Sequence, residues 1–282
     1  MSNKQKIESD GITLIRHLFF AENKRIFNTE QAREAAAKIG IPQNTLNVIL
    51  SRLFKQGIIR RIRRGLYASV GILGEVESIH PYVISAFLVQ PSAISHWSAL
   101  QHHGLTEQIP LTIMASTPMR VYTPSMRDPH LNDSDHKHAW VIDETRYEYI
   151  TIQEKHFNFG MEKIWIDPHF VVQITDKERT LLDVFVYSKM FGGMGGALGI
   201  LEEALGDIDI QRFANYAKQY DEKAVAKRIG WALEYFGVDE QYLRPLLDIP
   251  LASYCLLDPV GSAVGPCDKR WMIQNNLTKG EN

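Results

Sequence analysis

The chain has 282 residues, with 31 Lys and Arg against 33 Asp and Glu, and 45% of its residues are hydrophobic. This composition is typical of a soluble globular protein and argues against a disordered or fibrous chain. The length suggests about two domains.

The apolar runs and the cysteines exclude further classes. A bilayer span needs roughly 20 apolar residues, and the longest runs here are far shorter. The first residues, MSNKQKIESDGI, lack the apolar core of a signal peptide. Cys255 and Cys267 are the two cysteines, too few for a disulfide framework or a four-ligand zinc site. We therefore expect a cytoplasmic protein that has no membrane partner.

The near-zero net charge of the chain hides an asymmetry. Residues 1–75 hold 13 Lys and Arg against 6 Asp and Glu, a net charge of +7, which leaves −9 for residues 76–282. A basic segment joined to an acidic one is the pattern expected when the first meets a polyanion. The simpler alternative is chance segregation of solvated charge.

The basic segment begins with two predicted helices. The apolar spacing from Ile12 to about Glu22 predicts the first. The second opens at Asn28, whose side chain can cap it while Gln31 returns the hydrogen bond. Gly40 is expected to end it, because glycine accepts the left-handed backbone after a helix.

A third helix is predicted from Pro42, which suits a first helical position. Its apolar stripe must face a core, and its opposite face is short, polar and weakly cationic. Such a face can bond base edges in a DNA groove. The stripe is Leu46, Ile49, Leu50 and Leu53, and the opposite face is Asn44, Val48, Ser51 and Lys55, flanked by Thr45, Asn47 and Arg52.

A two-stranded hairpin follows this helix. Ile58, Ile59 and Ile62 favour a strand, Gly65 permits a tight turn, and Leu66–Ala68 returns. Together these elements predict a winged helix-turn-helix, with the third helix in the major groove and the wing on phosphates. Winged helices can also dock proteins, but clustered arginines favour an anionic partner, and the helix face favours double-stranded DNA over RNA. The wing arginines are Arg60, Arg61, Arg63 and Arg64.

Residues 76–282 are predicted to form a mixed α+β domain that ends in a helical bundle. Gly71–Gly74 is interpreted as the linker, and the polar stretch from Thr123 to His138 as a surface loop. Predicted helices span 82–89, 92–105, 200–205, 210–219 and 222–236, with another capped by Asp176; predicted strands span 111–116, 147–152, 162–166 and 171–175.

This second domain offers little that resembles catalysis. The glycine run 192–196 lacks the lysine of a phosphate loop and is interpreted as a flexible connection between helices. No histidine spacing fits a zinc helix, neither in His96, His102 and His103 nor in His130, His136 and His138. Asp176, Glu178 and Asp183 are acids of the kind that a nuclease needs to hold Mg²⁺, but Arg179 and Asp183 fit a surface ion pair better. We expect no enzyme, cofactor or metal.

Six segments, spread in order over nearly the whole chain, carry a resemblance to a known family. They are LSRLFKQGIIRRIRRGLY (50–67), ISHWSALQHHGLTEQIP (94–110), ERTLLDVF (178–185), GGALGILEEAL (195–205), YAKQYDEKAVAKRIGWALEYFG (216–237) and KRW (269–271). In series they resemble the AbiEi-type antitoxin family of phage-defence loci.

The resemblance implies a transcriptional autorepressor and antitoxin that counteracts a nucleotidyltransferase-type toxin. Operator contact would fall to the third helix and the wing, and antitoxicity to the second domain. Two protomers on an inverted repeat are expected, since such motifs double their contacts by symmetry. Two alternatives stay open: a stand-alone regulator whose second domain senses a ligand or partner, and a nuclease targeted by the winged helix.

Overall fold

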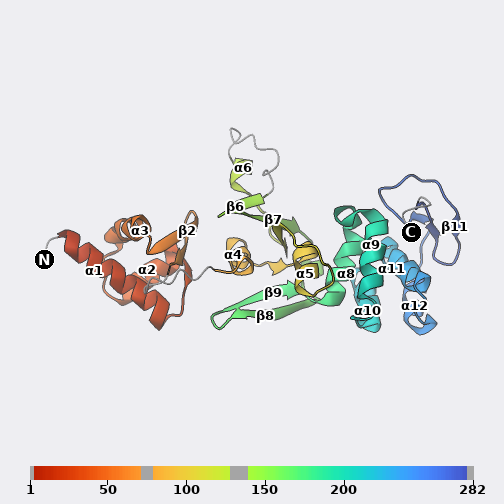
Figure 1. Cartoon of the computed structure of the whole chain (residues 1–282), viewed down its shortest axis with the longest axis horizontal. Coiled ribbons are helices and arrows are strands. Elements are labelled where there is room, and N and C mark those ends of the chain that lie inside the picture. Colours follow the sequence, from red (N-terminus) through yellow and green to blue (C-terminus); the bar gives the residue numbers. More distant parts are fainter. Residues whose placement is uncertain (1–2, 71–78, 128–138, 278–282) are drawn as a thin grey trace. The chain divides into compact units, whose positions relative to one another are not determined.

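The computed structural model describes residues 3–70, 79–127 and 139–277 (Figure 1). It divides into two compact units, the first formed by Met1–Gln90 with Trp165–Val171 and the second by Pro91–Ile164 with Val172–Asn282. The predicted linker Gly71–Gly74 and the predicted boundary after residue 75 lie outside the described residues. The first unit continues to Gln90 and so includes the helix α4 (Pro81–Leu88).

The first unit is built from helices and one small sheet. The three strands lie in the order β1-β3-β2, with both pairs antiparallel. The helices pack around a core that includes Leu14, Phe27 and Ile49. Besides α4, its elements are α1 (Asn3–Arg16), the π-helical turn η1 (His17–Ala21), β1 (Ile26–Asn28), α2 (Thr29–Lys38), the 3-10 turn η2 (Gln43–Thr45), α3 (Leu46–Lys55), β2 (Ile59–Arg63) and β3 (Leu66–Ser69).

These elements are consistent with the predicted winged helix-turn-helix and differ from the prediction in three places. The first helix begins at Asn3, well before Ile12, and ends in the turn η1. Pro42 precedes η2 in an extended conformation, so α3 begins only at Leu46. The strand β1 was not predicted, since three residues are too few to show an alternation.

The second unit contains a six-stranded mixed sheet in the order β6-β7-β5-β4-β9-β8. The strands β5 and β7 are parallel, and β6 pairs antiparallel with β7. The strands are β4 (Ala93–Ile94), β5 (Thr112–Thr117), β6 (Ala139–Ile142), β7 (Thr145–Thr151), β8 (Met161–Asp167) and β9 (Phe170–Thr175); the short helices among them are α5 (His96–His102), α6 (Pro124–Arg127) and α7 (Glu154–Phe157).

A helical bundle and a small three-stranded sheet follow. A large apolar core lies here, with α8, α10, α11 and α12 packed on one another (Figure 1). The predicted α+β class, with strands before a helical bundle, is confirmed at this level. The elements are α8 (Lys177–Val186), the 3-10 turn η4 (Ser188–Phe191), α9 (Gly193–Ala204), α10 (Ile210–Tyr220), α11 (Lys223–Tyr235), α12 (Glu240–Leu247), β10 (Cys255–Leu256), β11 (Cys267–Asp268) and β12 (Ile273–Gln274).

Three predictions for this unit were wrong. The predicted helix 92–105 begins instead as the strand β4, which pairs with β5 and β9, and becomes helical only at His96. The glycine run is not a flexible connection: Gly192 caps α9 with a left-handed backbone and the rest starts that helix. The strand β6 was assigned to no element. Of the predicted loop 123–138, residues 128–138 lie outside the described residues, and Pro124–Arg127 is helical.

Candidate nucleic-acid interface

The helix α2 is stabilised at its ends by local interactions that could be predicted from the sequence. The side chain of Asn28 accepts a 2.8 Å hydrogen bond from the backbone N–H of Gln31, and the side chain of Gln31 accepts one of 2.8 Å from the N–H of Asn28. This is the predicted capping box. Gly40 follows the helix with φ at +75°, the left-handed conformation that glycine adopts without strain. The turn into α3 is thereby fixed.

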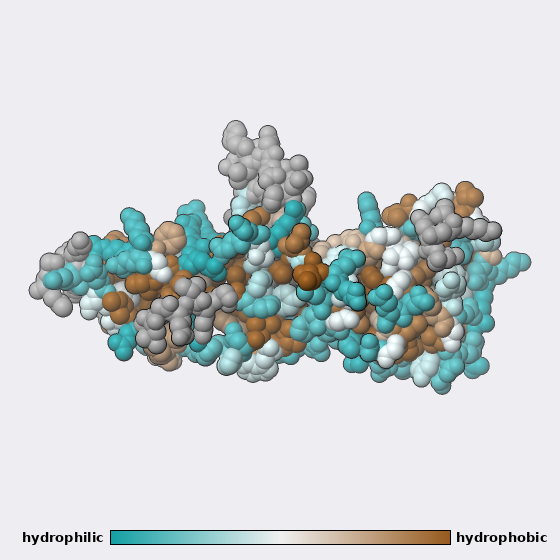
Figure 2. Space-filling view, in the orientation of Figure 1, coloured by the Kyte–Doolittle hydropathy of each residue, from teal (hydrophilic) through white to brown (hydrophobic). Residues whose placement is uncertain are grey.

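The helix α3 buries one face and exposes the other. Its apolar stripe of Leu46, Ile49, Leu50 and Leu53 is buried, as predicted. The side chains of Asn44, Asn47, Val48, Ser51 and Lys55 are exposed, whereas Thr45 and Arg52 are half-buried. Figure 2 shows hydrophilic side chains over the part of the first unit where Figure 1 labels α3 and β2. The polar face is therefore free of the domain's own core.

Two of the predicted contact residues differ in setting from the rest. Asn44 and Thr45 belong to the turn η2 and not to α3. The hydroxyl of Thr45 donates a 2.7 Å hydrogen bond to the carbonyl of Pro42, so this side chain stabilises the turn. Asn47, Val48 and Ser51 lie on the helix itself, on its exposed face.

The wing presents arginines around a buried isoleucine. A β-bulge between Arg61 and Arg63 shifts the register of β2 against β3, and Ile62 between them is buried. Such a bulge re-aims side chains by adding one residue to a strand. Arg61 and Arg64 are exposed, and Arg60 and Arg63 are half-buried. The guanidinium of Arg63 donates a 3.4 Å hydrogen bond to the carbonyl of Arg64.

A threonine that the sequence analysis missed ties the tip of the wing to α2. The backbone N–H of Thr29 donates a 3.0 Å hydrogen bond to the carbonyl of Gly65, and its hydroxyl donates a second of 3.4 Å. Gly65 has φ at +77°, which the turn requires. Thr29 therefore positions the wing arginines. Nothing in its local sequence pattern distinguishes it from an ordinary first residue of a helix.

The charges in this unit divide into neutralised and unneutralised groups. Lys24 and Lys38 each lie 2.7 Å from Glu22, and Arg33 lies 2.6 Å from Glu30. By contrast, no acidic side chain among the described residues forms an ion pair with Lys55, Arg61 or Arg64. The uncompensated positive charge therefore lies at the end of α3 and on the wing, where a phosphate backbone would supply the missing partner.

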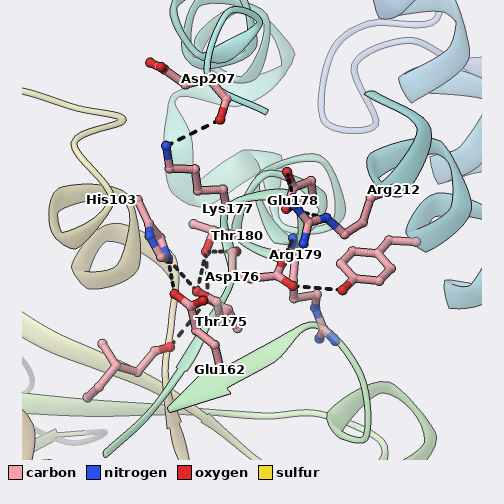
Figure 3. Close-up of polar contacts among 12 residues, drawn as sticks. His103, Glu162, Thr175, Asp176, Lys177, Glu178, Arg179, Thr180, Asp207 and Arg212 are labelled. Carbon is pink, nitrogen blue, oxygen red and sulfur yellow. Dashed lines mark hydrogen bonds and ion pairs between the residues drawn. The ribbon is translucent and has the colours of Figure 1, made fainter. Parts of the chain in front are cut away.

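The carboxylates of α8, the candidates for a nuclease, are engaged in structural contacts (Figure 3). Asp176 accepts a hydrogen bond from the N–H of Arg179 at 2.8 Å and another from the hydroxyl of Tyr216 at 2.8 Å. Burial and this carboxylate raise the pKa of Tyr216 to about 12. Glu178 lies 3.1 Å from the guanidinium of Arg212.

The expected surface ion pair between Arg179 and Asp183 is instead fully buried. Both side chains are 0% exposed, and Nε of Arg179 donates a 3.0 Å hydrogen bond to Oδ1 of Asp183. Arg179 also donates to the backbone carbonyls of His156 and Phe159, and its guanidinium lies 4.7 Å from the centre of the Phe159 ring. The prediction failed because the spacing of two residues on a helix predicts that they form an ion pair, but it does not show whether other parts of the chain bury that pair.

The histidines within the described residues also have structural settings. His96 is buried, with Nδ1 2.7 Å from the hydroxyl of Ser95, and burial lowers its pKa. His103 donates a 2.6 Å hydrogen bond from Nε2 to the carbonyl of Thr175 (Figure 3). His130, His136 and His138 lie outside the described residues. Within 3–70, 79–127 and 139–277, no three His, Cys, Asp or Glu side chains are grouped as metal ligands.

Comparison with known proteins finds a family match within the N-terminal unit. Residues 18–70 match the model of the family described as "Transcriptional regulator, AbiEi antitoxin". The resemblance to the AbiEi antitoxins is confirmed. The AbiEi match includes α2, α3 and both strands of the wing, and so all of the predicted DNA-contacting residues. It supports a general role as an antitoxin or transcriptional regulator.

Solved structures extend the comparison to the fold of the rest of the chain. The crystal structure of the RV2827C protein from Mycobacterium tuberculosis resembles it with a TM-score of 0.60, at 12% sequence identity. The alignment covers 93% of this chain and 90% of that chain, which shows a shared fold. No curated protein matches the chain significantly. In the described parts of the chain, none of the helices has the length and apolar character needed to cross a membrane.

Proposed function

We propose that this chain is a DNA-binding autorepressor and antitoxin that counteracts a cognate nucleotidyltransferase-type toxin of a phage-defence locus. The observation that carries the proposal is the exposed polar face of α3 beside the exposed wing residues Arg61 and Arg64, which form no ion pair among the described residues, inside the segment that matches the AbiEi antitoxins.

The DNA-binding step follows from the shape and charge of the first unit. The face of α3 with Asn47, Val48 and Ser51 enters the major groove, where side chains of this length reach base edges. Arg61, Arg63 and Arg64 on the wing contact phosphates and supply affinity that does not depend on sequence. Two protomers bind an inverted repeat, each reading one half-site.

Toxin neutralisation is assigned to residues 76–282, and we infer that it is not enzymatic. The contacts of the acidic residues support this second point: Asp176, Glu178 and Asp183 each stabilise the fold through a hydrogen bond or ion pair, which leaves them poorly placed to hold a catalytic metal. The account therefore places DNA binding in the first unit and toxin neutralisation in the second.

Co-expression with the toxin of the same operon tests this division. The full chain, wild type or Arg63→Ala with Arg64→Ala, is expressed beside the induced toxin and a reporter driven by the operon's promoter. The wild type should restore growth and repress the reporter, whereas the double variant should restore growth without repression. Failure of the well-expressed wild type to restore growth would contradict the antitoxin role.

A groove in the second unit favours one alternative, a stand-alone regulator that senses a ligand. The groove has a volume of about 450 Å³ and is lined by Trp97, Ile109, Leu111 and Met190, among others. Apolar hollows of this size take small ligands. In that case promoter repression would respond to a small molecule, and growth in the presence of the toxin would not be restored.

A further inference from the structure

Val48 is an apolar side chain at the centre of a polar surface. It is 47% exposed. At about 100° per residue, Ser51 lies about one turn after it on the same face of α3, and Asn44 lies in the turn η2 just before the helix. Lys55 continues this face by a further turn. On a helix laid in a groove, the middle of the outward face comes nearest to the base edges.

The domain's own stability does not account for a valine at this position. The core of the unit takes the other face of α3, where Leu46, Ile49, Leu50 and Leu53 are buried. A β-branched residue on an exposed helical face has a lower helix propensity than Ala, Glu or Lys. The exposed methyl groups of Val48 are therefore available to an apolar partner outside the domain.

The neighbours of Val48 indicate which partner this is. Asn44 and Asn47 are exposed, and an asparagine amide can bond both N6 and N7 of an adenine. The thymine paired with that adenine carries the one apolar group in the major groove, its 5-methyl. We propose that α3 reads A·T pairs in its operator, with Val48 in contact with a thymine methyl. This inference rests on the proposed function, in which α3 enters the major groove.

Replacing thymine by uracil removes this methyl group and leaves base pairing intact. A selection from random duplexes with the full wild-type chain first identifies the preferred site. Each thymine of that site is then replaced singly by uracil, and binding is measured for the wild type, for Val48→Ala and for Phe54→Ala. Phe54 is a matched control, because it is 50% exposed on the same helix but points in a direction rotated by about 240° from that of Val48 about the helix axis.

The expected result is one thymine per half-site whose replacement weakens wild-type binding about fourfold, the value for one buried methyl group. Val48→Ala should abolish this sensitivity to uracil, and Phe54→Ala should retain it. The inference would be overturned if Val48→Ala bound the uracil-substituted site as weakly, relative to the thymine site, as the wild type does. It would also be overturned if no uracil replacement weakened wild-type binding. Either result would leave DNA binding by α3 intact. A selection that yields no preferred sequence would overturn the proposed sequence-specific function as well.

Discussion

Glu22 joins three parts of the N-terminal unit through charge. Its carboxylate lies 2.7 Å from Nζ of Lys24, 2.7 Å from Nζ of Lys38 and 3.4 Å from Nε2 of His17. These partners come from η1, the segment before β1 and the end of α2. The hydrogen bonds from Lys24 and Lys38 lower the pKa of Glu22 from 4.5 to about 2.

Glu22→Gln should lower the free energy of unfolding by about 1 kcal/mol at pH 7, since the 58% exposure of Lys38 lets solvent weaken the pair. As the pH falls, the unfolded chain takes up this proton first, because the folded-state pKa lies lower. The stabilisation present above about pH 5 is thus lost progressively towards pH 2. Urea denaturation at several pH values measures it. Glu34→Gln is the control, and a pH-independent difference between Glu22→Gln and wild type would contradict the account.

The buried pair of Arg179 and Asp183 makes a second prediction for single residues. Arg179→Ala should destabilise the protein by about 3–5 kcal/mol, because it leaves the carboxylate of Asp183 buried without its partner. Denaturant unfolding checks this. The double variant, Arg179→Met with Asp183→Leu, should lose less free energy of unfolding than Arg179→Ala, because it leaves no buried charge without a partner. Arg212→Ala, which breaks a pair with a half-exposed guanidinium, is the matched control and should cost about 1 kcal/mol or less.

At the scale of elements, the sequence predicted what local interactions determine. The capping box of α2, the buried stripe of α3, the turn at Gly65 and the cap of α8 by Asp176 all depend on residues a few positions apart. The exposed face of the candidate site followed from the same helical spacing. These features could be predicted because their causes lie within one or two turns of chain.

The predictions that failed depend on distant parts of the chain. Ala93 and Ile94 form a strand because β5 and β9 lie beside them, and no local pattern shows this. The role of Thr29 depends on Gly65, 36 residues later. Tertiary packing decided each case.

The capping box gives a prediction at this scale. Asn28→Ala should destabilise the protein by about 1 kcal/mol, since it removes the acceptor for the N–H of Gln31. Asn28→Ser keeps an acceptor at the cap and should stay close to the wild type. Thermal unfolding of the three proteins compares them. Equal melting temperatures for Asn28→Ala and the wild type would show that the cap contributes nothing.

At the scale of the whole molecule, the two units differ in charge and in the functions proposed for them. Residues 1–75, which make up most of the first unit, carry +7 and the remainder −9, so this N-terminal segment attracts a polyanion and the rest of the chain repels one. Lys55 at the end of α3 and Arg61 and Arg64 on the wing form no ion pair with an acidic side chain among the described residues. DNA binding by these two elements is the central claim, because the proposed repression depends on it.

The salt dependence of DNA binding tests this claim most directly. Wild type, Arg63→Ala with Arg64→Ala, and Lys218→Ala with Lys223→Ala are titrated with one duplex at several salt concentrations. The last variant is the control, since it removes two exposed charges of the same sign from the second unit. The account predicts a wild-type affinity that falls steeply with salt, and a slope smaller by about 1.8 for the wing variant alone, as two phosphate contacts are lost. An unchanged slope for the wing variant, or an equal reduction in the control, would contradict it.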